Sequence, residues 1–277
     1  MSLASVILAF GLFAISSPLV RDGMQGEEIE VSRSDVLGYY KGQSVLEHYE
    51  EATRRVGAWA SEQLVLRQSF PDRQASLLEL GCGTGRICLS LWMLGYENLT
   101  GTDFSKDMIK RALQAQKERA SRVRFAVEDA TRLSYSNDSF HGVIFGFNGL
   151  MQIPGRGNRL RAMREACRVL KKGGRFVFTT HDRAFPKWKK FWLVEKKKWR
   201  SGQQDQSLID FGDRFEETPR GKLFIHVPAA TEIREDLKKA GFLVERDLLR
   251  SRVAEESELV KKFSDECRFW VARKPLD

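Results

Sequence analysis

One stretch of this chain constrains the fold more than any other, namely residues 77–91, with the sequence LLELGCGTGRICLSL. Leu77, Leu78 and Leu80 form the short apolar run that is typical of a strand covered on both faces of a parallel sheet. The glycines that follow permit backbone angles and close approaches that a Cβ atom would block. The helix expected from Arg86 begins with unpaired N–H groups that face the turn. The stretch therefore predicts a strand, a glycine turn and a helix that cradle a charged small ligand.

The spacing of these glycines separates two classes of ligand. A dinucleotide fingerprint requires Gly-x-Gly-x-x-Gly or Ala, but counting from Gly81 and Gly83 places Arg86 at the third small position. The pattern present is Glu-x-Gly-x-Gly-x-Gly, which resembles motif I of the class I S-adenosylmethionine-dependent methyltransferases. A glycine turn alone is weak evidence, so the alternative of a plain strand, turn and helix stays open until the downstream spacing is checked.

The first glutamate of the motif needs a partner, because a carboxylate inside an apolar strand is costly to bury alone. We expect Glu79 at the carboxyl end of the strand, facing the ammonium group of a ligand. The resemblance implies that the ligand is S-adenosyl-L-methionine. The motif residues expected to contact it are Glu79, Gly81, Cys82, Gly83, Thr84 and Gly85.

An acidic residue follows the second expected strand, near Leu99, roughly 20 residues past the glycine turn, where a carboxylate can accept hydrogen bonds from both ribose hydroxyls. Asp103 fits this role, and Phe104 beside it could cover one face of the adenine ring. The alternative for Asp103 is a helix cap, but Ser105 already suits the N-cap of the next helix.

A second acidic position follows the third expected strand, residues 123–127. In the family that this chain resembles, an acidic residue here accepts a hydrogen bond from the adenine amino group, and the next backbone N–H reaches a ring nitrogen. Asp129 and Ala130 match these positions. The alternative for Asp129 is an ordinary turn residue.

The fourth expected strand, residues 140–147, ends in Phe147-Asn148-Gly149. Ligands of an open parallel sheet sit beyond the carboxyl ends of its strands, so we expect Phe147 at the cofactor and Asn148 where methyl donor and acceptor meet. An Asn amide can orient an acceptor through both its donor and its acceptor atoms. A plain Asn-Gly turn is the alternative.

The fifth expected strand ends at His181 and Asp182. It closes the string REACRVLKKGGRFVFTT, which resembles the helix and strand after the active site in the ubiquinone-biosynthesis-like branch of the family. His181 is the first candidate general base, because an unperturbed imidazole titrates near neutral pH, and Asp182 could orient it. His226 is the second candidate. A structural role is an equal alternative for each of them.

The resemblance implies an α/β fold, a Rossmann-like doubly wound sheet of about seven strands that are mostly parallel, with a terminal antiparallel hairpin. A helical pattern runs from Val45 to about Leu66, and Tyr39 and Tyr40 before it are candidate lid residues or buried aromatics. The expected organisation is an apolar leader and polar linker at 1–37, and one methyltransferase domain at 38–277 with N-terminal helices at 38–70 and an inserted substrate or lid segment at 183–227.

Composition agrees with one large domain, since the chain has 277 residues with 42% hydrophobic and 30% charged content. Its four cysteines show no Cys-x-x-Cys spacing, so neither a metal site nor a disulfide framework is indicated, and a reducing, cytoplasmic setting is expected. Residues 2–20 carry no charge and are mostly apolar. They lack a basic region before them, so a membrane contact or targeting segment is the minority expectation beside an appended leader.

The expected insertion is strongly basic and rich in aromatic residues between Lys187 and Arg200. Such a segment could bind nucleic acid through phosphate neutralisation and base stacking. The favoured interpretation is a helix with Trp188, Trp192 and neighbouring aromatics inward and its lysines in water.

Three functions remain open from the sequence. The leading one is a methyltransferase that uses S-adenosyl-L-methionine and acts on a small-molecule acceptor. The second is an RNA or protein methyltransferase that uses the basic insertion. The third is a module that binds the cofactor without catalysis. The sequence indicates neither the acceptor nor the oligomeric state.

Overall fold

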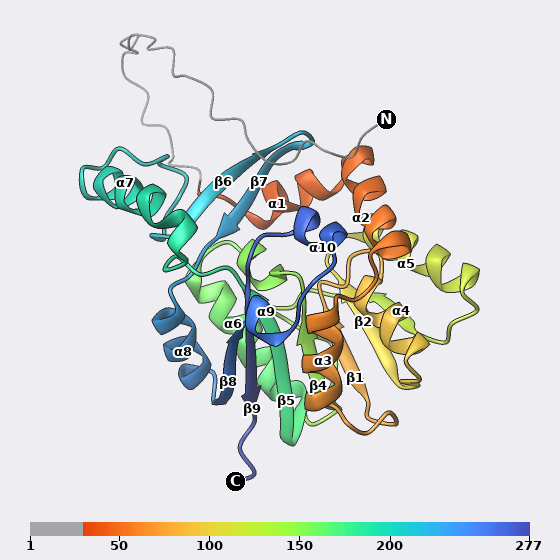
Figure 1. The fold of residues 1–277 in the computed structure, drawn as a ribbon. Helices are drawn as coiled ribbons and strands as arrows, with labels where there is room; N and C mark the ends of the chain where they lie inside the picture. Colours follow the sequence, from red (N-terminus) through yellow and green to blue (C-terminus); the bar gives the residue numbers. More distant parts are fainter. Residues whose placement is uncertain (1–29) are drawn as a thin grey trace.

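The computed structural model describes residues 30–277, and a seven-stranded sheet forms its centre (Figure 1). The strand order is β3-β2-β1-β4-β5-β9-β8, in which β9 runs antiparallel to both of its neighbours and the other pairs are parallel. The strands of the sheet are β1 (Leu77–Leu80), β2 (Leu99–Asp103), β3 (Arg124–Val127), β4 (Phe140–Phe145), β5 (Leu170–Thr180), β8 (Leu243–Leu249) and β9 (Arg268–Arg273). The predicted fold class is confirmed.

Helices cover both faces of this sheet (Figure 1). They are α1 (Arg33–Tyr40), α2 (Gln43–Arg55), α3 (Ala60–Ser69), α4 (Arg86–Met93), α5 (Lys106–Glu118), α6 (Arg156–Val169), α7 (Lys189–Arg200), α8 (Ala230–Lys239), α9 (Arg250–Val253) and α10 (Glu258–Phe263), with short 3-10 turns η1 (Gly149–Gln152) and η2 (Pro186–Trp188). Between residues 30 and 277, none of these helices is both long and apolar enough to cross a bilayer. The leader predicted at 2–20 lies outside the described residues.

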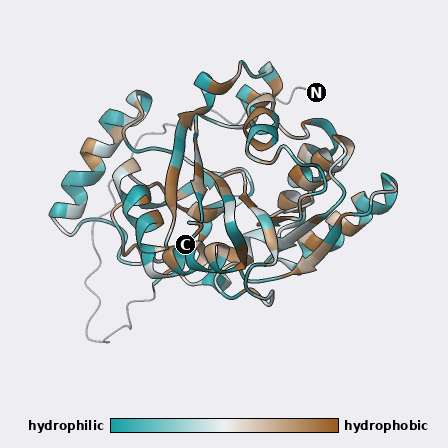
Figure 2. Cartoon of the chain, turned by 90° about the horizontal axis from the view of Figure 1, so that it is seen from below, coloured by the Kyte–Doolittle hydropathy of each residue, from teal (hydrophilic) through white to brown (hydrophobic). Residues whose placement is uncertain are grey.

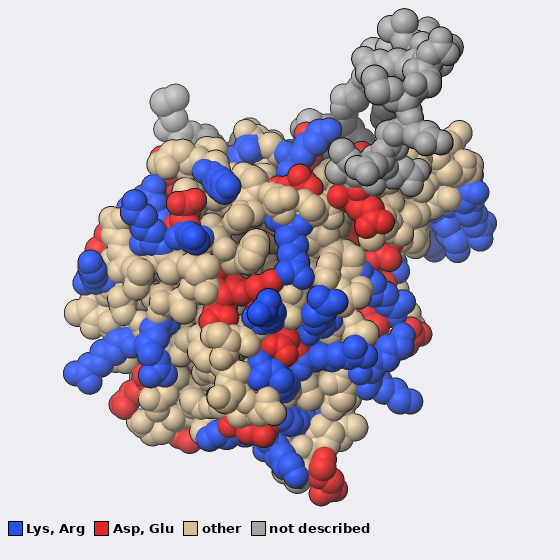
Figure 3. All heavy atoms as spheres, turned by 180° about the vertical axis from the view of Figure 1, so that it is seen from behind, with Lys and Arg blue, Asp and Glu red and all other residues tan. Residues whose placement is uncertain are grey.

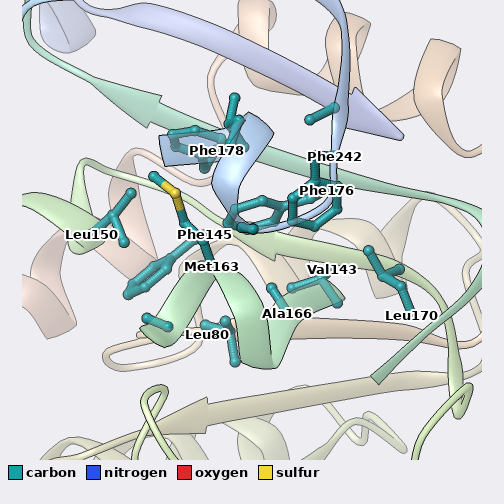
Figure 4. Packing of buried hydrophobic residues seen from close by; sticks show 14 of the residues in the cluster. Leu80, Val143, Phe145, Leu150, Met163, Ala166, Leu170, Phe176, Phe178 and Phe242 are labelled. Carbon is teal, nitrogen blue, oxygen red and sulfur yellow. The ribbon is translucent and has the colours of Figure 1, made fainter. Parts of the chain in front are cut away.

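Two apolar layers hold the helices to the sheet. On one face, Phe176 and Phe178 of β5 stack on each other and pack with Met163 and Ala166 of α6 (Figure 4). On the other face, α3 and α4 bury a second cluster against β1, β5 and β9. The two innermost strands, β1 and β4, are mostly apolar and buried, as parallel strands covered on both faces must be, and hydrophobic segments alternate with polar ones elsewhere in the fold (Figure 2).

Strand order reverses at β1, which lies between β2 and β4. In an open α/β sheet this reversal leaves a crevice beyond the carboxyl ends of the strands, and the crevice is where such folds bind ligands. The turn after β1 and the ends of β2 and β4 therefore meet at one edge of the sheet.

One predicted helix is interrupted in the structure. The helix predicted from Val45 to Leu66 is divided into α2 and α3, because Gly57 adopts a φ of +62° that a continuous helix does not allow.

The range predicted as linker contains a helix. Ser32 caps α1, since its hydroxyl accepts a hydrogen bond from the Asp35 backbone and the Asp35 carboxylate accepts one from the Ser32 backbone.

The insertion predicted at 183–227 is also more regular than expected, because it holds α7 and an antiparallel hairpin, β6 (Asp213–Thr218) and β7 (Gly221–His226). The hairpin lies against α1, and α7 lies on the flank of the molecule (Figure 1). Strand β7 of this hairpin also contacts η1.

Candidate functional site

A cavity with about 950 Å³ of empty space, a figure that includes open solvent at its mouth, lies beyond the carboxyl ends of β1, β2 and β4. Its walls come from the glycine turn, the ends of β2, β3 and β4, the turn η1, and helices α1 and α2. Seven of the predicted site residues line it: Gly81, Gly83, Asp103, Phe104, Asp129, Ala130 and Phe147.

The glycine turn needs its glycines. Gly81 and Gly83 have φ values of +60° and +54°, which L side chains rarely adopt. A Cβ on Gly81 would lie 2.7 Å from Cε2 of Phe145, so the strand end beside it leaves no room for a side chain. Backbone atoms therefore line the cavity at this turn.

Asp103 ends β2 and holds the turn in place. Its carboxylate accepts hydrogen bonds from the backbone of Gly83 at 2.9 Å and of Ser105 at 2.8 Å. Burial raises the pKa of Asp103, against the lowering effect of these two hydrogen bonds. A carboxylate has about four acceptor positions, so two remain for a ligand diol.

Asp129 lies beyond β3 and is already engaged on both oxygens. Oδ1 accepts from the backbone N–H and the hydroxyl of Thr131, both at 2.8 Å. Oδ2 forms an ion pair with Arg33 of α1. A ligand amino group at Asp129 would thus share this oxygen with Arg33.

Four residues of the motif do not line the cavity. The buried carboxylate of Glu79 accepts a hydrogen bond from the backbone of Cys88 at 2.9 Å, and burial raises its pKa to about 7. Thr84 donates to the carbonyl of Tyr49 at 2.9 Å. Gly85 is the left-handed N-cap of α4. The structure thus places Glu79, Cys82, Thr84 and Gly85 behind the turn, where they fix its shape.

Asn148 and His181 lie together just outside the cavity lining. Nδ1 of His181 is 2.9 Å from the carbonyl oxygen of Glu266, and because a carbonyl accepts, Nδ1 carries the proton. Nε2 of the same ring lies 3.3 Å from Nδ2 of Asn148. Oδ1 of Asn148 is buried without a hydrogen-bond partner in the described part of the chain. Phe147 and Gly149, on either side of Asn148, do line the cavity.

The expected orientation of His181 by Asp182 is not found. The Asp182 carboxylate instead accepts from Nη2 of Arg268 at 3.0 Å and from the backbone of Ala184 at 2.9 Å. The Glu266 carbonyl occupies the position that Asp182 was expected to take.

His226, the second candidate base, is far more enclosed. Its two ring nitrogens lie 2.7 Å from carboxylate oxygens of Asp213 and Glu232, and the residue is 2% exposed. It does not line the cavity. Asp210, Asp213 and His226 are near enough for one cation, but Arg159 and backbone N–H groups already hold the two aspartates.

Helix α1 supplies a wall that the sequence did not predict. Arg33, Val36 and Leu37 line the cavity together with Tyr40, whose hydroxyl donates to Oε1 of Gln152. The candidate lid residue Tyr40 thus does contact the site. Burial raises the pKa of Tyr49, whose ring centroid on α2 lies 5.9 Å from that of Tyr40, to about 12, so its hydroxyl stays protonated at neutral pH.

An aromatic stack closes the cavity near β4. Phe147 adopts a φ of +47° and lies with its ring centroid 5.1 Å from that of Phe263, which in turn stacks on His48 at 5.2 Å. Helices α2 and α10 are thereby joined over the end of the sheet.

Comparisons with known proteins agree with this geometry. Residues 77–174 match the protein family described as a methyltransferase domain. Demethylmenaquinone methyltransferase of Bacteroides fragilis is 28% identical over 190 residues, covering 65% of this chain and 71% of that protein. The 27-O-demethylrifamycin SV methyltransferase of Amycolatopsis mediterranei is 32% identical over 142 residues, 50% of this chain and 48% of that protein. The chain thus spans about half the length of that relative.

Solved structures resemble the whole fold. A SAM-dependent methyltransferase from Methanosarcina mazei superposes with a TM-score of 0.62 at 20% identity, over 77% of this chain and 98% of that one. The [4+2]-cyclase SpnF superposes with a TM-score of 0.56 at 20% identity, over 85% of this chain and 97% of that one.

The sheet, the glycine turn and the match over residues 77–174 together support an S-adenosylmethionine-dependent methyltransferase of class I, the class that this chain resembles. S-adenosyl-L-methionine is the cofactor that this class implies, and the residues fit it. The cavity is large enough for a nucleoside with an amino-acid tail, the turn offers bare backbone, and Asp103 retains acceptor positions.

Proposed function

We propose that this chain methylates a small-molecule acceptor. The observation that carries the proposal is the enclosure of the cavity: α1 covers it, and Val36, Leu37 and Phe147 give it a mostly apolar lining. A compact acceptor can be surrounded in such a space, whereas a folded protein or a nucleic-acid strand needs an open groove. The names of the two relatives above fit this choice.

Positioning is the main task of these residues. When bound, the cofactor would supply a methyl group on a positively charged sulfur; the acceptor lone pair would bond to the methyl carbon as the carbon–sulfur bond breaks. We assign the ribose hydroxyls to Asp103, the amino-acid tail to the backbone at Gly81 and Gly83, and the adenine edge to Asp129 and Ala130. Holding both partners in line can supply much of the lowering of the barrier.

A general base is needed only if the nucleophilic atom of the acceptor carries a proton that it does not release at neutral pH. His181 is the proposed base for that case, because its Nδ1 lies against the Glu266 carbonyl and its Nε2 lies 3.3 Å from the amide of Asn148, a residue between two that line the cavity. Asn148 is the proposed orienting group, since its Oδ1 has no hydrogen-bond partner in the described part of the chain and would bind an acceptor hydroxyl or amino group once its side chain turns to the cavity.

The nucleic-acid alternative is weakened by the insertion itself. Trp192 of α7 is 9% exposed, and Trp188 and Phe191 pack into the same cluster with Ile225 and Val227. Stacking of bases requires exposed rings, which this helix turns inward.

The test is incubation of the purified chain with methyl-labelled cofactor and a metabolite extract, followed by mass spectrometry. We expect one low-molecular-weight compound to gain a labelled methyl group, with the gain lost in Asp103→Asn and kept in Asp107→Asn, an exposed acid in the first turn of α5. Label found in RNA or in polypeptide, or no labelled product at all, would contradict the proposal.

A further inference from the structure

Helix α7 presents two contrasting faces. Its inner face, with Trp188, Phe191 and Trp192, joins an apolar cluster with Met151 and the hairpin strand β7. This packing fixes the helix on the flank of the molecule, apart from the helices that cover the sheet (Figure 1). The orientation of the outer face is therefore set by the fold.

The outer face combines aliphatic and cationic groups. Leu193 and Val194 are 55% and 54% exposed at the middle of the helix. Exposed basic residues border them on both sides: Lys189, Lys190, Lys196, Lys197 and Arg200. The acid of the helix, Glu195, is paired with Lys198 at 2.8 Å. Among residues 30–277 no carboxylate forms an ion pair with the five bordering cations, and basic side chains stand at the outermost part of this flank (Figure 3).

The start of the described chain lies beside the same helix. The backbone N–H of Val31 donates to the carbonyl of Ser207 at 3.2 Å, a few residues after the end of α7.

We propose that α7 docks on an anionic phospholipid surface, with Leu193 and Val194 among the headgroups and the lysines against the phosphates. Charge complementarity and exposed aliphatic groups on one helix face are what an interfacial helix requires. A nucleic acid would use the same charge but gains nothing from two aliphatic side chains. The proposal is independent of the proposed function, because α7 contributes no residue to the cavity lining.

The experiment is co-sedimentation of the full chain with vesicles of phosphatidylcholine alone or mixed with phosphatidylglycerol. We expect binding to the mixed vesicles, and at least about tenfold weaker binding for the double variant Lys196→Glu with Lys197→Glu. The matched control is Lys238→Glu with Lys239→Glu, two exposed lysines in the last turn of α8, which we expect to bind like the wild type. Circular dichroism verifies that both variants fold.

A second variant separates the aliphatic contact from the charge. Leu193→Ser with Val194→Ser keeps every lysine, and we expect weaker binding to mixed vesicles, with the remaining binding lost at high salt because it depends on charge alone. Three results would overturn the proposal: equal loss in the two lysine variants, equal binding to both vesicle types through residues 2–20 alone, or retention on RNA that depends on Lys196 and Lys197 without retention on vesicles.

Discussion

Buried charges are treated differently in two regions of this molecule. Glu79 lies behind the glycine turn and is buried, and Asp103 beside the turn is partly buried; within residues 30–277 neither forms an ion pair, and burial raises both pKa values, that of Glu79 to about 7. At the end of the insertion, His226 lies between Asp213 and Glu232 of α8, and although burial acts to raise the pKa of Glu232, His226 and Arg183 bring it below its usual range. The groups around His226 are thus matched between the insertion and α8, whereas Asp103 keeps acceptor positions for a ligand.

The largest effect on stability should follow from removal of the His226 side chain. His226→Ala leaves Asp213 and Glu232 facing each other in a buried space, and loss of one partner of a buried pair costs about 3–5 kcal/mol. Urea unfolding of the variant should show this loss in the free energy of unfolding, while His141→Ala, an exposed position, should lose less than about 1 kcal/mol. Equal losses would remove the contrast between the two regions.

The contribution of Glu79 to stability should depend on pH. Its folded pKa of about 7 lies above the ordinary value of 4.5, so its contribution to stability is fully present below pH 4.5 and is lost as pH rises to about 7. The loss amounts to about 3 kcal/mol at most. Glu79→Gln should therefore gain stability relative to the wild type between these pH values, measured as the difference in unfolding free energy. A difference that does not vary with pH would show that Glu79 is ionised throughout.

A substitution in the glycine turn should have a smaller effect on stability, and a glycine in α6 offers a matched control. Gly81→Ala places a Cβ against Phe145 in a left-handed conformation, which should destabilise the chain by about 1–3 kcal/mol and weaken cofactor binding. Gly157→Ala in α6 meets no atom within 4 Å and should be neutral or stabilising by up to about 1 kcal/mol. Thermal unfolding and calorimetry compare the two, and normal cofactor binding by Gly81→Ala would place the cofactor elsewhere.

The smallest effect concerns α1. Arg33 and Asp129 are each partly exposed, so their ion pair is worth about 1 kcal/mol or less. Because Arg33 occupies an oxygen that the adenine amino group would use, Arg33→Ala should raise cofactor affinity by up to about fivefold. A fall in affinity would instead show that Arg33 closes over the bound ligand.

Local patterns in the sequence were sufficient for the sheet and for one side of the cavity. Apolar runs predicted the strands, and the distance from the glycine turn selected Asp103 and Asp129, which the structure brings to one cavity. The position of the Glu79 carboxylate was not readable, because it depends on α4, whose Cys88 backbone donates to it; its predicted contact with a ligand ammonium group stays a prediction.

The opposite wall could not be predicted, because it depends on contacts between distant segments. Arg33 stands in a polar stretch and reaches Asp129 only when α1 packs over the sheet edge. The hairpin was missed as well, although Thr-Pro-Arg-Gly at 218–221 between alternating residues is a usable turn signal. The basic composition of the insertion drew attention away from that alternation.

The most direct test of the central claim is calorimetric titration with S-adenosyl-L-homocysteine, the demethylated product of the cofactor. We predict one binding site in the wild type, an affinity at least about tenfold lower in Asp103→Asn, and no change in the matched variant Asp107→Asn. Absence of heat in the wild type, or the same affinity in all three proteins, would contradict the claim that the ends of β1, β2 and β3 converge on one adenosyl ligand.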